Sequence, residues 1–66
     1  MRIEHYVKAL DDLTFAQEAL QDQLRTATAY EGICLLQILK MNAETRNMVQ
    51  GMLDAAQHED SFVNLS

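Results

Sequence analysis

Apolar side chains in the second half of the chain recur at alternating steps of four and three residues. This spacing places side chains along one line of an α-helix that packs against another helix. A neighbouring apolar line widens the surface into a broad stripe, which is typical of a helix in a bundle. We name the first line the seam (Cys34, Ile38, Met41, Thr45, Met48, Met52 and Ala55) and the second the flanking row (Leu35, Leu39, Val49, Leu53 and Ala56).

The first half of the chain carries one apolar helical face, with Gln17 as its polar interruption. Proline is absent and glycine occurs only at positions 32 and 51, so few positions break the helical periodicity. The sequence therefore predicts an all-α fold. The face in the first half consists of Ile3, Tyr6, Val7, Leu10, Leu13, Leu20 and Leu24.

The periodicity predicts two long helices joined by a short turn. The first helix is expected from about residue 3 to 25, the turn at 26–28 and the second helix from about 29 to 58. Residues 59–66 form a C-terminal tail in this prediction. The first 58 residues then make an antiparallel helical hairpin.

Polar residues mark one helix start and leave two alternatives open. Thr28 with Glu31 three positions later matches a capping box, which predicts the start of the second helix. A break of the first helix near Asp12, or of the second near Asn42, would divide the hairpin further. The apolar stripe keeps its phase across both places, which favours continuous helices.

A chain of 66 residues forms at most one small domain with a marginal core. Below roughly 70 to 80 residues such a core seldom supplies more than about 3 to 5 kcal/mol without a staple or a partner. The single cysteine has no intrachain mate, so oligomerisation is the expected solution: a homodimer that completes a four-helix bundle. The predicted core joins both helical faces through Leu10, Leu13, Leu20, Leu24, Cys34, Ile38, Met41, Met48 and Met52.

Several large apolar residues do not fit the stripes and predict a second buried surface. Ile33 and Leu36 point nearly opposite to Ile38 on a helical wheel, and Phe15 points away from Leu10. Leaving each in water costs about 1.5 to 3 kcal/mol, which favours burial by another chain. Alternatively, single exposed apolar residues are normal, and a bend at Asp12 turns Phe15 inward. The predicted partner or dimer interface is Phe15, Tyr30, Ile33 and Leu36.

The tail carries three apolar residues, Phe62, Val63 and Leu65, after an acidic helix end. One alternative is that it folds back onto the apolar end made by Ile3 and Tyr6. The other is a free segment that orders only on a target, as termini often do. The ordering cost of about 1 to 2 kcal/mol per residue favours the second alternative, a recognition tail.

Charge and hydropathy exclude several partners. Ten acidic residues against five basic residues give a net charge of −5, which disfavours phosphate backbones, and the scattered acids do not form the dense track of a DNA mimic. The longest apolar run, residues 33–39, is far shorter than the ~20 residues that span a membrane. The first eight residues lack the apolar centre of a signal peptide, so we expect a cytoplasmic protein without a membrane partner.

Candidate chemistry is sparse. Cys34 lies on the seam, where a cysteine acts mostly as a small apolar side chain. His58, Glu59 and Asp60 are consecutive and do not share a helical face, so they do not form a metal site. The sequence has no glycine-rich phosphate loop, catalytic triad pattern or paired catalytic carboxylates, so we expect neither an enzyme nor a cofactor.

These features predict a small interaction module, a regulator or inhibitor that binds and occludes a surface of another protein. The alternative is a heterodimeric chaperone in which a partner's helices cover Phe15, Ile33 and Leu36. In size, acidity and predicted hairpin the chain resembles the chaperones of type III secretion needle subunits, Rop-like dimeric hairpins and small phage-encoded inhibitors. This resemblance is one of format, because no motif is matched residue by residue. The basic, aromatic RNA-binding face of Rop-like hairpins is not reproduced here.

Overall fold

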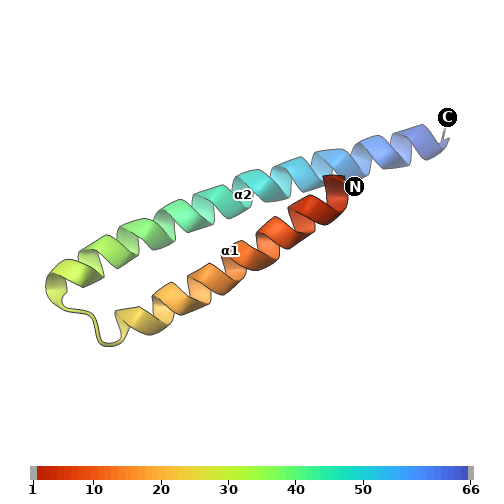
Figure 1. Ribbon diagram of the computed structural model, residues 1–66. Coiled ribbons are helices and arrows are strands. Elements are labelled where there is room, and N and C mark those ends of the chain that lie inside the picture. Colours follow the sequence, from red (N-terminus) through yellow and green to blue (C-terminus); the bar gives the residue numbers. More distant parts are fainter. Residues whose placement is uncertain (1, 66) are drawn as a thin grey trace.

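Two α-helices lie antiparallel in the computed structural model and form a hairpin (Figure 1). Helix α1 comprises Arg2–Leu24 and helix α2 comprises Ala29–Leu65. The structure describes the backbone of residues 2–65 and the side chains of residues 3–58. The predicted all-α hairpin is confirmed.

Both helices are continuous at the two places where a break was considered. Asp12 lies within α1 and Asn42 within α2, and all residues between the helix ends are helical. The predicted end of the second helix is wrong, because α2 continues through residue 58 to Leu65. In the sequence, positions 62 and 63 continue the spacing of the two stripes, and no proline or glycine follows Gly51 to stop the backbone. A helix does not need a packed face to continue for two more turns.

The turn at residues 25–28 is tight and ends in the predicted capping box. The backbone N–H groups of Arg25, Thr26 and Ala27 donate to carbonyls three residues earlier, at N–O distances of 3.3 to 3.4 Å, which satisfies the last carbonyls of α1. The Thr28 hydroxyl accepts a hydrogen bond from the N–H of Glu31 at 3.3 Å. The Glu31 carboxylate accepts one from the N–H of Thr28 at 3.0 Å.

The hairpin is long and thin, with principal extents of 56 × 15 × 12 Å. The end of α2 runs past the start of α1, so this part of α2 has no helix beside it (Figure 1). Among the described side chains, the buried apolar ones are Leu53 and Ala56, and none is fully buried. Over residues 2–65, neither helix combines the length and hydropathy needed to cross a membrane.

Candidate interaction surfaces

The contact between the helices is built on the flanking row of α2. Leu35, Leu39 and Val49 are half-buried, and Leu53 and Ala56 are buried. Asn42 and Arg46 complete the same line, because positions 35, 39, 42, 46, 49, 53 and 56 follow steps of four and three residues without a gap. The contact line on α1 has the same spacing, through Ile3, Tyr6, Leu10, Leu13, Gln17, Leu20 and Leu24, all half-buried.

Among the described side chains, two polar contacts cross this interface. The Asn42 side-chain amide donates to the Leu13 carbonyl at an N–O distance of 3.2 Å, and the Arg46 guanidinium donates to the Gln17 side-chain oxygen. The carbonyl oxygen of the Asn42 amide is buried and finds no partner among the described residues. Because buried polar groups need partners, the hydrogen bond from Asn42 favours the register in which Asn42 lies level with Leu13. In that register Arg46 lies about two helical turns from the level of Gln17, so the two long side chains meet by reaching along the interface.

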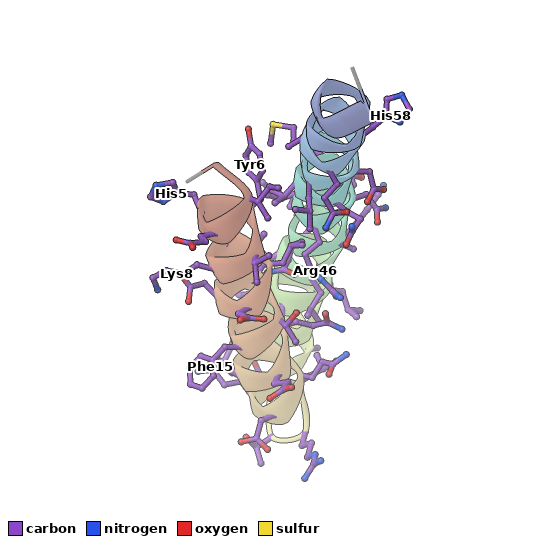
Figure 2. The ribbon with its side chains drawn as sticks, turned by 90° about the vertical axis from the view of Figure 1, so that its right-hand side faces the viewer. His5, Tyr6, Lys8, Phe15, Arg46 and His58 are labelled. Carbon is purple, nitrogen blue, oxygen red and sulfur yellow. The ribbon has the colours of Figure 1, made fainter. Side chains whose placement is uncertain are left out.

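Arg46 is the contact residue that sequence reasoning missed. Its charge placed it among the scattered basic residues of the surface, yet its side chain is half-buried beside α1 (Figure 2). The unbroken spacing from Leu35 to Ala56 was the available signal. A long side chain buries its methylenes against the neighbouring helix while its charged end reaches a polar group.

Most of the seam faces solvent. Ile38, Met41, Met48 and Met52 were predicted to belong to the hairpin core, and all four are exposed. Within one chain the predicted core is therefore corrected at these four residues. Its other members are half-buried: Leu10, Leu13, Leu20, Leu24 and Cys34. The reason is angular, because successive residues differ by about 100° and the seam therefore lies about a quarter-turn from the flanking row.

The predicted interface residues are exposed, but they do not form one surface. Phe15 is two residues from Leu13, about 200° around α1, and its ring points away from α2 (Figure 2). Ile33 is nine residues from Asn42, about 180° around α2, and so points away from α1. Tyr30 lies on the side of the seam, close to the angle of Met48. Phe15 and Ile33 therefore occupy opposite outer faces, and no single flat partner covers both with Tyr30.

The exposed surface is large for a chain of this mass. A compact monomeric protein of 7.5 kDa exposes about 4,250 Å² by the scaling of surface with mass, whereas this chain exposes 5341 Å². The difference, about 1,100 Å², exceeds the roughly 800 Å² that each partner buries in a standard protein interface. The large apolar side chains that contribute to it are Val7, Phe15, Tyr30, Ile33, Leu36, Ile38, Met41, Met48 and Met52.

A shallow groove lies on the side of the hairpin away from the methionines. It encloses about 180 Å³ and is lined by Leu10, Ala43, Arg46, Asn47 and Gln50. Small-molecule sites are mostly apolar and measure about 300 to 1,000 Å³. The groove is smaller and has three polar side chains among its five, so it marks a polar side of the hairpin.

The residues considered for chemistry are dispersed. His5 and His58 are both exposed and point to opposite sides of the molecule (Figure 2). Among the described residues, no three histidine, cysteine, aspartate or glutamate side chains gather into a possible metal site. Among the described groups, Glu31 has a shifted pKa: the hydrogen bond from the Thr28 N–H, and then the Thr28 hydroxyl, hold the pKa of its carboxyl below the usual value.

The predicted recognition tail concerns Phe62, Val63 and Leu65, whose side chains lie outside the described residues. Their backbone belongs to α2.

Comparison of the chain with protein-family models, with curated proteins and with solved structures finds no match.

Proposed function

We propose that this protein is a non-enzymatic interaction module: a hairpin that dimerises into a four-helix bundle and regulates or inhibits another protein by occupying its surface. The observation that carries the proposal is the imbalance between core and surface. Leu53 and Ala56 are the buried apolar residues among those described, whereas nine large apolar side chains are exposed. A core this small supplies little stability, so a second chain is the economical source of the rest.

Dimerisation accounts for part of the exposed apolar surface and leaves part of it free. Because Phe15 and Ile33 point in opposite directions, a partner on one face of the hairpin leaves at least one of them in water. An apolar side chain that stays exposed in the dimer is a candidate contact for a target protein. The net charge of −5 disfavours nucleic acid as that target.

Sedimentation equilibrium combined with circular dichroism over a wide range of protein concentrations tests the dimer. We expect a discrete, helical dimer. A heterodimeric chaperone, the alternative, predicts instead a poorly folded or aggregating chain that becomes helical and monodisperse only with its partner. A well-folded monomer at all concentrations would contradict both proposals.

Affinity capture from the native host tests the regulatory role. The wild-type dimer and the variants Phe15→Lys and Ile33→Lys serve as parallel baits, because each variant places a charge on one outer face. We expect one protein to be retained at near-equal molar amounts by the wild type and to be lost with one of the variants. Equal recovery of all proteins by the three baits would contradict a target site on these faces.

A further inference from the structure

We infer that the seam of α2 is the surface on which a second copy of this chain docks, so that two seams pack against each other in the dimer. This inference rests on the proposed dimer and assigns its interface. It replaces the interface expected from sequence, in which Phe15, Ile33 and Leu36 shared one surface.

The two sides of the hairpin differ in polarity. One side holds the groove with Ala43, Asn47 and Gln50. Met41 is nine residues from Gln50, about 180° around α2, and therefore lies on the opposite side. That side carries the whole seam, and its seven residues include no charged side chain. The seam is thus the least polar long surface that the hairpin leaves uncovered.

The hydroxyl of Thr45, the polar side chain at the centre of the seam, already has a partner. Its hydroxyl donates to the Met41 carbonyl within α2, at an O–O distance of 2.9 Å. Burying a hydroxyl is costly mainly when it loses its hydrogen bonds to water without replacement. A partner chain can therefore cover Thr45 without leaving its donor unpaired.

The neighbouring face of α1 leaves room for a partner. Ala16 and Ala19 lie about 60° and 120° around α1 from Leu13, on the side away from the Leu10 groove and hence beside the seam. Their small side chains form a low surface beside the turn-proximal part of the seam, and the exposed Asp12, about 100° around α1 from Leu13 in the same direction, borders it. A two-fold axis relates the two copies in a symmetric dimer, so the same surface of each chain forms the interface. The long seam side chains of one copy can then lie over the small alanine side chains of the other.

The available area fits a second copy of the chain. The surplus exposure of about 1,100 Å² per chain, to which the outer faces with Phe15 and Ile33 contribute as well as the seam, exceeds the roughly 800 Å² per partner of a standard interface. From Cys34 to Ala55 the seam extends for about 32 Å at 1.5 Å per residue, so it offers a contact along most of the hairpin. A symmetric pairing of uncharged seams also needs no complementary charge, which suits two chains that each carry a net charge of −5.

Two lysine variants with matched starting exposure test the assignment. Met48 on the seam and Ile33 on the outer face are both 66% exposed in the hairpin. Met48→Lys and Ile33→Lys each reduce the net negative charge, so weaker association cannot come from greater overall repulsion. By sedimentation equilibrium we expect the dimer dissociation constant to rise about 100-fold or more for Met48→Lys, because an unpaired charge enters a desolvated surface twice. For Ile33→Lys we expect a change of less than about 3-fold.

The possible outcomes test two claims separately: that the chain forms a dimer, and that the seam is the interface of that dimer. A wild-type chain that stays monomeric and helical overturns both the dimer and this assignment. A wild-type dimer that Ile33→Lys weakens as much as, or more than, Met48→Lys leaves the dimer in place and overturns the seam as its interface.

Alkylation of Cys34 decides the matter if Met48→Lys fails to fold. Cys34 belongs to the seam and is half-buried in the hairpin. In the wild-type protein, at concentrations where the circular dichroism is constant, we expect its alkylation rate to fall about 10-fold as dimer replaces monomer. A rate that stays constant while the sedimenting mass doubles would overturn the assignment.

Discussion

The seam of α2 has the same spacing as the flanking line, which is the flanking row together with Asn42 and Arg46, but the two lines differ in burial. Each position of the flanking line is one residue after a position of the seam, so the two lines run along the same helix about 100° apart. The flanking row packs on α1 and supplies the buried residues, whereas Ile38, Met41, Met48 and Met52 of the seam are exposed. The less apolar line is therefore the one that faces the other helix.

Polar matching explains this choice. The contact line of α1 contains Gln17, which needs a hydrogen-bonding partner when it is half-buried. The flanking line brings Arg46 to it, and it also brings Asn42 to the Leu13 carbonyl. With the seam turned toward α1, Gln17 would lie level with Ile38, which offers no hydrogen bond. The two lines of α2 have the same period, and hydrogen bonds to α1 favour the line that carries Asn42 and Arg46 as the contact line.

The largest expected effect separates Leu53 from its neighbour Met52. Leu53 is 7% exposed and Met52 is 47% exposed, although they are adjacent in α2. We expect Leu53→Ala to lower the free energy of unfolding by about 2 to 4 kcal/mol, because it removes part of a small core. The measurement is urea denaturation followed by circular dichroism.

Met52→Ala is the matched control for this prediction. At low protein concentration we expect it to cost less than about 1 kcal/mol, since its side chain is half in water within the hairpin. Its cost should grow as the dimer forms. Equal losses for the two variants at low concentration would contradict the different roles of the two rows.

A double-mutant cycle on Gln17 and Arg46 tests whether polar matching orients α2. Arg46→Met keeps much of the side-chain volume and leaves Gln17 without its partner, so we expect a loss of about 1.5 kcal/mol in urea denaturation. Adding Gln17→Leu should recover most of that loss, because the unpaired amide is then gone. Additive losses in the double variant would show that the two side chains act independently.

The sequence was sufficient for the hairpin but not for the orientation of its second helix. Spacing and the absence of breakers predicted two helices, and the Thr28 and Glu31 pair predicted where α2 begins. Periodicity gives the angular width of an apolar stripe, but not which edge of the stripe meets a neighbour. That depends on a tertiary match between Gln17 and Arg46, which lie 29 positions apart. The separation of Phe15 from Ile33 likewise follows only when both helices are oriented.

The capping box provides a change that lies outside both rows. Thr28→Ala removes the hydroxyl that accepts from the Glu31 N–H, and we expect a loss of about 1 kcal/mol in the free energy of unfolding. Thr26→Ala, in the same turn, is the control and should change stability by less than about 0.5 kcal/mol. Because the cap acts on folding alone, neither variant should alter the dissociation constant of a fully folded dimer. A large change in that constant would place the turn in the interface.

The smallest expected effect is the pH dependence of the same cap. Hydrogen bonds from Thr28 hold the pKa of Glu31 below its ordinary value of 4.5 in the folded chain, so the folded state favours the ionised carboxylate. This contribution to stability is complete above the unfolded-state pKa and is lost as the pH falls through the lower folded-state value.

Glu31→Gln keeps an acceptor oxygen but has no charge, so it isolates the ionisable part of the cap. We expect the wild type to be slightly more stable than Glu31→Gln in urea at pH 7, and the difference to vanish at the acid end of a pH series. A difference that persists unchanged in acid would mean that hydrogen-bond geometry at Thr28, and not the ionised carboxylate, distinguishes the two chains. Glu31 is exposed, so water and salt screen its charge. Added salt should therefore reduce the difference in unfolding free energy between the wild type and Glu31→Gln at pH 7.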